Sequence, residues 1–141
     1  MKTPMDEEQQ SNNDPQEQLK QARFERDEEF ESLYANNVII ESSSLDATLV
    51  FGQLDTHTGS PVIQQHTAVS LPWPTAKLLV YFLQVLIADQ ESQNGKVKIP
   101  IGILPPIIPV PEGANPRQQK VIELAQQLHH QLVADLAKPE E

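Results

Sequence analysis

Residues 71–93 read L-P-W-P-T-A-K-L-L-V-Y-F-L-Q-V-L-I-A-D-Q-E-S-Q, and this stretch decides the fold. Pro72 and Pro74 stand where a helix accepts proline, at its first turn. The residues that follow are apolar nearly all the way round a helix: Leu78, Leu79, Tyr81, Phe82, Leu83, Val85, Leu86 and Ile87. A helix of this kind is buried on more than one side. Asn94 and Gly95 then end it with residues that tolerate a left-handed conformation.

Three strands are predicted before this helix, at residues 33–42, 46–55 and 61–71. The links between them are rich in turn residues and too short for a parallel crossover, so the strands form an antiparallel meander. Strict alternation places Ile63, Gln65, Thr67 and Val69 on one face of the third strand. We therefore expect an α+β fold, in which a three-stranded antiparallel meander packs on the long apolar helix.

A three-stranded sheet offers the helix only one apolar face, so much of the helix surface needs another cover. A second subunit, the proline-rich segment that follows and the C-terminal helix are the candidates. Because the surplus is large, we expect a homo-oligomer, a dimer or larger.

The segment 99–111, I-P-I-G-I-L-P-P-I-I-P-V-P, is apolar, yet its five prolines exclude a regular helix or a central strand. We expect an extended arm that turns isoleucines and Leu104 onto apolar surface of its own chain or of a partner. Alternatively, Pro106 and Pro109 form a P-x-x-P ligand for an aromatic groove. Trp73 either closes the edge of the core or offers an exposed aromatic contact. The candidate interaction residues are Trp73, Ile101, Ile103, Leu104, Ile107, Ile108 and Val110.

Composition divides the chain into five parts. The polar leader should be disordered, and the acidic stretch after it has only a thin apolar stripe for a helix. The C-terminal helix repeats apolar residues at spacings of three and four, with Asn115 as its cap and Pro116 at its first position. The parts are a leader (1–15), a possible acidic helix (16–32), the core domain (33–99), the arm (100–114) and the C-terminal amphipathic helix (115–138).

Charge and residue usage exclude several classes of function. The net charge of −10, with no basic cluster, disfavours nucleic acid. No cysteine is present, which excludes disulfides, thiolate nucleophiles and zinc ribbons. The N-terminus has no apolar signal region, and no apolar run reaches the roughly 20 residues that span a bilayer, so we expect a cytoplasmic protein without membrane contact.

The residues that usually carry chemistry do not converge in the sequence. Neighbours such as His129 and His130 point in different directions on a helix, so they do not share a metal readily. The Ser42–Ser44 cluster fits a tight turn, and no nucleophile elbow, phosphate loop or dinucleotide fingerprint occurs. We therefore expect no enzyme, no cofactor and no metal site.

The order of short motifs resembles a known family. Tyr34-Ala35-Asn36 opens a strand, Ser42–Asp46 turns it, Val50-Phe51-Gly52 lies in the second strand, and Pro74-Thr75-Ala76-Lys77 with Leu78-Leu79 begins the helix that Gly95 ends. This pattern is similar to a small bacterial domain family of unknown function, over residues 34–99. Two departures are Ala47, where the family tends to have Phe, and Asp89-Gln90, where it has Y-E.

The resemblance implies a fold and an origin, and no activity. The order strand–strand–strand–helix is also similar to one protomer of the SecB-type export chaperones, which are acidic oligomers with apolar grooves, although a fold does not fix a function. From the sequence we expect a non-enzymatic, oligomeric protein-interaction module. The alternatives are a SecB-like chaperone that holds apolar polypeptide segments, and an enzyme with an unrecognised site.

Overall fold

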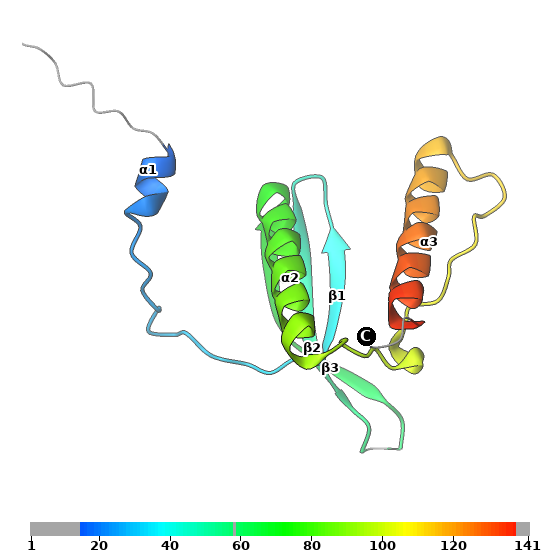
Figure 1. Cartoon of the computed structure of the whole chain (residues 1–141), viewed down its shortest axis with the longest axis horizontal. Coiled ribbons are helices and arrows are strands. Elements are labelled where there is room, and N and C mark those ends of the chain that lie inside the picture. The colour runs from blue at the N-terminus through cyan, green and yellow to red at the C-terminus, as the bar shows by residue number, and fades with distance from the viewer. Residues whose placement is uncertain (1–14, 58, 138–141) are drawn as a thin grey trace, which may run out of the picture.

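A computed structural model describes residues 15–57 and 59–137 (Figure 1). In these ranges the strands form one antiparallel sheet in the order β1-β2-β3, and the long helix α2 follows β3 directly. The α+β meander with its helix is therefore confirmed. The leader expected at 1–15 lies outside the described residues except for Pro15. The elements are α1 (Pro15–Lys20), β1 (Asn37–Ser42), β2 (Asp46–Asp55), β3 (Val62–Pro72), α2 (Trp73–Asn94), the short 3-10 helix η1 (Ile101–Ile103) and α3 (Pro116–Ala137).

The turn between β1 and β2 is held by Ser43 and Asp46. The Ser43 amide donates to the Asp46 carbonyl over 2.9 Å, and the Ser43 hydroxyl lies 2.5 Å from the Asp46 carboxylate. The same hydroxyl accepts hydrogen bonds from the amides of Leu45 and Asp46, both at 3.1 Å. A serine three residues before an aspartate thus closes the hairpin from both sides, as side chains of this kind do in tight turns.

Asn36 extends the pairing of β2 beyond the start of β1. Its amide donates to the Gly52 carbonyl over 3.2 Å, and its side-chain oxygen accepts a hydrogen bond from the Leu54 amide over 2.7 Å. Because β2 is longer than β1, the Asn36 side chain replaces a backbone acceptor that β1 does not supply. The asparagine of the Tyr-Ala-Asn motif therefore has a structural role.

A β-bulge interrupts the pairing of β2 with β3. Phe51 lies opposite Thr67, whereas Gly52 lies opposite Gln65, so His66 is the extra residue. A Cβ atom on Gly52 would lie 2.9 Å from the Gln64 carbonyl oxygen, which is closer than such contacts allow. Glycine is therefore required where the bulged strand approaches β2.

The bulge overturns the strict alternation expected along β3. Residues directly opposite in an antiparallel pair share a face, so Thr67 and Val69 lie on the face of β2 that carries Leu49 and Phe51. Ile63 is paired with Leu54, which is three positions from Phe51 and therefore lies on the opposite face of β2, because the extra residue reverses the alternation.

The acidic stretch forms a much shorter helix than the expected 16–32. Only α1, Pro15–Lys20, is helical, and residues 21–36 run as an irregular segment away from the sheet (Figure 1). Phe24 on this segment is 100% exposed. The thin apolar stripe has nothing to pack against, and isolated helices shorter than about 12–15 residues are marginal in water.

The C-terminal helix α3 begins as predicted. The Gln118 amide donates to the Asn115 side-chain oxygen over 2.9 Å, and the Asn115 amide donates to the Gln118 side chain over 3.1 Å. This reciprocal pair is a capping box with Pro116 at the first helical position. In Figure 1, α3 stands apart from the sheet and α2.

Candidate interaction surface

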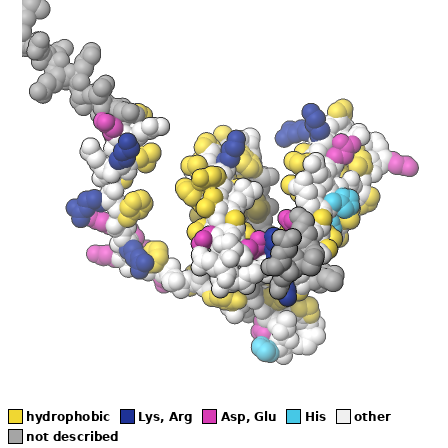
Figure 2. Space-filling view, viewed as in Figure 1, with side chains coloured by type: hydrophobic (Ala, Val, Ile, Leu, Met, Phe, Trp, Pro, Cys, Tyr) yellow, Lys and Arg dark blue, Asp and Glu magenta, His cyan; other side chains and the backbone are white. Residues whose placement is uncertain are grey.

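Around the sides that the sheet does not cover, α2 presents an apolar surface to water. Tyr81 is 59% exposed, Phe82 55% and Leu86 63%, whereas Ala76 and Leu79 are half-buried. Figure 2 shows the hydrophobic side chains gathered over this helix. We call the following eight residues the α2 face: Leu78, Val80, Tyr81, Phe82, Leu83, Val85, Leu86 and Ile87.

The sheet buries little beneath α2. Among the apolar side chains of the described residues, only Ala47 is buried. Ala47 lies opposite Leu71, which is half-buried like Thr67 on the same face, while Ala68 and Ser70 on the other face are exposed. Helix α2 therefore covers the face of the sheet that carries Ala47.

The cover lies mainly over two of the three strands. Helix α2 contacts β3 and β2. On β1, the side chains of Val38 and Ile40 share the covered face through their pairing with Phe51 and Leu49, yet Ile40 is 66% exposed. The helix axis thus lies over β2 and β3, and the β1 side of the same face remains open.

Burial of the exposed α2 face by a partner would gain a large free energy. Full burial of one large apolar side chain stabilises by about 1.5–3 kcal/mol, so eight half-exposed side chains leave roughly 6–12 kcal/mol unrealised. That sum is comparable to the whole net stability of a domain, about 5–15 kcal/mol. An apolar face of this size is typical of an interaction surface.

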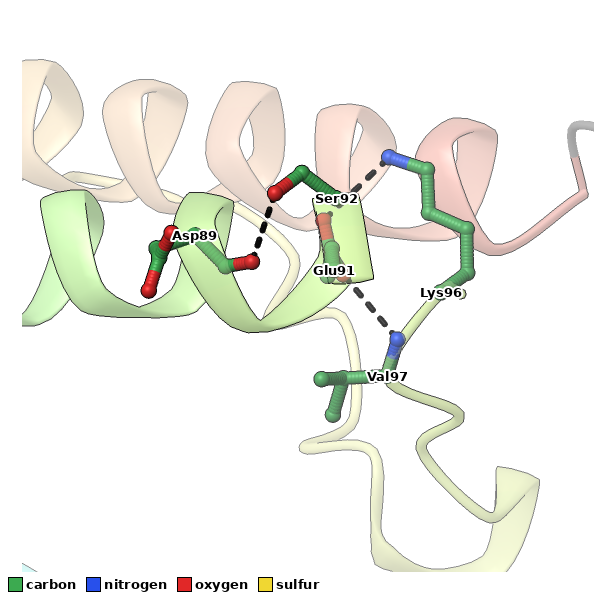
Figure 3. Close-up of polar contacts among 5 residues, drawn as sticks. All are labelled: Asp89, Glu91, Ser92, Lys96 and Val97. Carbon is green, nitrogen blue, oxygen red and sulfur yellow. Dashed lines mark hydrogen bonds and ion pairs between the residues drawn. The ribbon is translucent and has the colours of Figure 1, made fainter. Parts of the chain in front are cut away.

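The far end of α2 is anchored by Glu91 (Figure 3). Its carboxylate accepts a hydrogen bond from the Val97 amide over 3.1 Å and lies 3.3 Å from the Lys96 ammonium. Gly95, with φ of 82°, donates its amide to the Glu91 carbonyl over 3.0 Å. The predicted end of the helix at Asn94 and Gly95 is confirmed, and these contacts fix the direction in which the chain leaves the α2 face.

The proline-rich arm lies against α3 of its own chain. The Gln126 side chain donates to the Ile108 carbonyl over 2.8 Å. Pro105–Ile108 and the α3 residues Ala125, Leu128, His129 and Leu132 line an apolar recess between the two segments. Its volume is about 280 Å³, at the lower limit of the roughly 300–1,000 Å³ typical of ligand sites. The recess fits one or two side chains better than a cofactor.

Within one chain, most of the arm residues whose side chains the structure describes do not turn inward, so their burial against a partner stays a prediction. Ile103 is 69% exposed, Ile108 58% and Ile107 49%, and only Leu104 is half-buried. Proline removes backbone donors and fixes the backbone, so the arm touches α3 without laying all its isoleucines on it. Val110 is also exposed, and Ile101 lies in η1.

Trp73 is the first residue of α2 and is 45% exposed. It lies at the corner between β3 and the helix, half in contact with the chain and half in water. This partial exposure does not decide between the two interpretations of Trp73, a plug of the core edge and an exposed aromatic contact, and both stay predictions.

Two of the histidines, His57 and His66, have hydrogen-bond partners, whereas Nδ1 of His129 is buried without one among the described residues. The ring nitrogens of His66 lie 3.1 Å from the Tyr34 carbonyl oxygen and 2.9 Å from the Thr67 hydroxyl. The His57 amide donates to the Asp55 carboxylate in the turn after β2. Over the described ranges, no three His, Cys, Asp or Glu side chains gather as metal ligands, and no helix is long and apolar enough to cross a membrane.

Sequence reasoning missed two surfaces of the sheet. One is the open β1 side of the covered face, and the other is the outer edge of β3. A signal for the second was present, because residues 62–72 contain no charged side chain.

Comparison with known proteins matches the first 99 residues and leaves the arm and α3 outside. The family model described as a protein of unknown function (DUF3467) covers residues 1–99. This range includes the whole sheet and α2. No curated protein and no solved structure matches the chain.

Proposed function

The chain belongs to the DUF3467 family, and we propose that it is a non-enzymatic, homo-oligomeric protein-interaction module. The observation that carries the proposal is the α2 face, which lies within the part of the chain that the family model matches. The polar motif residues Asn36, Ser43 and Asp46 support a non-enzymatic role, because they complete the backbone pairing of the sheet.

A second copy of the chain is the occupant that the energetics and charge of the α2 face favour. If two such faces buried each other completely, the free energy gained would double to at most roughly 12–24 kcal/mol. Association costs about 4–15 kcal/mol in lost freedom, which is less than this gain over most of the two ranges. Residues 78–88 carry no charge, so two faces meet without like-charge repulsion despite the net charge of −10. Lys77 and Asp89 bound this stretch, and antiparallel helices would place these opposite charges at the same end.

The test of this proposal is the mass in solution, measured by light scattering at micromolar concentration. The parent chain should have the mass of a dimer or a larger assembly. Phe82→Asp combined with Leu86→Asp should lower that mass to one chain, because an unpaired charge is buried only at large cost. A parent with the mass of one chain at every concentration contradicts the proposal.

Helix α3 supplies a matched control for that double variant. Val121 and Leu124 are 60% and 53% exposed, close to Phe82, but lie outside the family match and outside the arm recess. Val121→Asp with Leu124→Asp introduces the same charges into a helix of the same length and should leave the mass unchanged. Equal dissociation by both double variants would show that the α2 face is not the specific contact.

A chaperone that holds apolar polypeptide segments is the second candidate. The observation that favours it is the apolar surface left outside the α2 face: Ile40 on β1, and Ile103 and Ile108 on the arm. A holder should slow the aggregation of a chemically unfolded test protein at equal molar ratio, and Ile103→Asp with Ile108→Asp should remove that effect without changing the mass of the oligomer. If the parent chain does not slow the aggregation, the chaperone candidate is refuted and the interaction module still stands.

A further inference from the structure

We propose that β3 is the strand through which two copies join. In this arrangement, β3 of one copy pairs antiparallel with β3 of the second about a two-fold axis perpendicular to the sheet. The two three-stranded sheets become one six-stranded sheet. Both α2 helices then lie on the same face of it. The inference rests on the proposed homo-oligomer and assigns its interface.

Apart from the bulge at His66, the outer edge of β3 lacks the features that protect sheet edges. In the strand order β1-β2-β3, β3 pairs with β2 on one side only. It has 11 residues, contains no charged side chain and has proline only at its last position, Pro72. Exposed edges are normally kept short or carry charges, prolines or a covering segment. The other edge strand, β1, has 6 residues and carries Glu41.

The bulge at His66 confines the pairing to one half of β3. Residues 62–65 before the bulge stay paired with β2 in a shifted register, and a bulge bends its strand locally. Residues 67–71 follow it as a regular strand that stays in register with β2 up to Pro72. We assign the two-fold axis to this half.

The position of α2 over the sheet favours pairing of two copies through the β3 edge over pairing through the β1 edge. Neighbouring strands lie about 4.8 Å apart. A helix axis that lies midway between β2 and β3 is half a strand spacing from β3, on the side of β2. The two-fold axis is half a strand spacing from β3 on the opposite side, toward the second copy. The two α2 helices are then about 10 Å apart, at the upper end of the 8–10 Å range of packed helices. The same two-fold rotation therefore pairs the two β3 strands and packs the two α2 helices.

Pairing through β1 does not bring the helices together. The same helix position lies one and a half spacings inside β1, so a two-fold axis outside β1 separates the helices by about 19 Å. Helices with their side chains are about 10–12 Å wide, so they would not touch. Most of the α2 face would stay in water, and the burial that drives the proposed association would be lost.

Single cysteines test this interface cleanly, because the chain has none of its own. On a two-fold axis, one residue opposes its own copy with Cα atoms about 4.5–5.5 Å apart, within the range of a disulfide. The residue next to it lies about 8 Å from its copy and does not cross-link. We expect one position to form a covalent dimer on mild oxidation among Thr67→Cys, Ala68→Cys, Val69→Cys, Ser70→Cys and Leu71→Cys.

Matched cysteines on β1, at Val38, Ile39 and Ile40, should remain uncross-linked. Cross-linking on β1, or an oligomer that cross-links at none of the five β3 positions, overturns the β3 interface while the proposed oligomer stands. A parent chain with the mass of a single copy overturns both.

Hydrogen exchange of the parent protein gives a second measurement that needs no substitution. If β3 is paired on both edges, all amides of residues 67–71 exchange slowly in the oligomer, and alternate amides lose that protection on dilution to single chains. Fast exchange of the outward amides in the intact oligomer overturns the proposal.

Discussion

Replacing Gly52 by alanine tests the close approach of β2 and β3 at the bulge. The added methyl group would lie 2.9 Å from the Gln64 carbonyl oxygen and 3.0 Å from Cγ2 of Ile63. The Ile63 side chain can move, but the Gln64 carbonyl belongs to the backbone of the ladder. The strands must therefore separate locally, and overpacking of this kind costs about 1–3 kcal/mol.

An opposing effect reduces the expected loss. Alanine restricts the unfolded chain more than glycine does and stabilises by about 0.4–1 kcal/mol where the backbone conformation suits it. Gly52 is not among the glycines with positive φ, so this gain applies. The net destabilisation of Gly52→Ala should be about 1–2 kcal/mol, which lowers the Tm by roughly 5–15 °C in a domain of this size.

Thermal and urea unfolding at one fixed protein concentration measure this difference, because the stability of an oligomer depends on concentration. Gly102→Ala is the matched control. A Cβ atom on Gly102 meets nothing within 4 Å, and its φ is not positive. The control should be neutral or slightly stabilised. If Gly52→Ala is as stable as Gly102→Ala, the steric account of the bulge is refuted.

Three further substitutions test single contacts. Asn36→Ala removes the acceptor of the Leu54 amide and should destabilise the sheet by about 1 kcal/mol in urea unfolding, whereas Asn37→Ala, without such a bond, should change it less. Asn115→Ala removes the cap of α3 and should reduce helical circular dichroism, at a cost of about 0.5–2 kcal/mol; an unchanged spectrum contradicts the capping box. Ser43→Ala should destabilise the hairpin by about 1 kcal/mol more than Ser44→Ala, and equal stability of the two would refute the turn assignment.

The sequence by itself determined the features that depend on a few neighbouring residues. Pro74 near the start of α2 and Gly95 after its end mark the helix boundaries. Asn115 and Pro116 mark the start of α3. These signals are reliable because each satisfies backbone groups, or fixes a backbone angle, within one turn of the chain. The meander also follows locally, since its links are too short for any other pairing.

The sequence predicts that α2 has an apolar surface that the sheet does not cover, but it does not predict how far that surface extends. The all-round apolar composition of residues 78–87 predicts that one sheet face cannot cover the helix. It does not reveal that α2 contacts mainly β2 and β3, which leaves Ile40 open. That position depends on how the helix leaves the corner at Trp73.

Only the tertiary structure decided the bulge at His66, the short α1 and the docking of the arm. The bulge depends on the fit of Gly52 against a strand more than ten residues away. Helix α1 ends at Lys20 because no surface packs against the residues after it. The arm reaches α3 through Gln126, 18 residues from its partner Ile108. Each outcome depends on which distant surfaces meet, and no local pattern in the sequence contains that information.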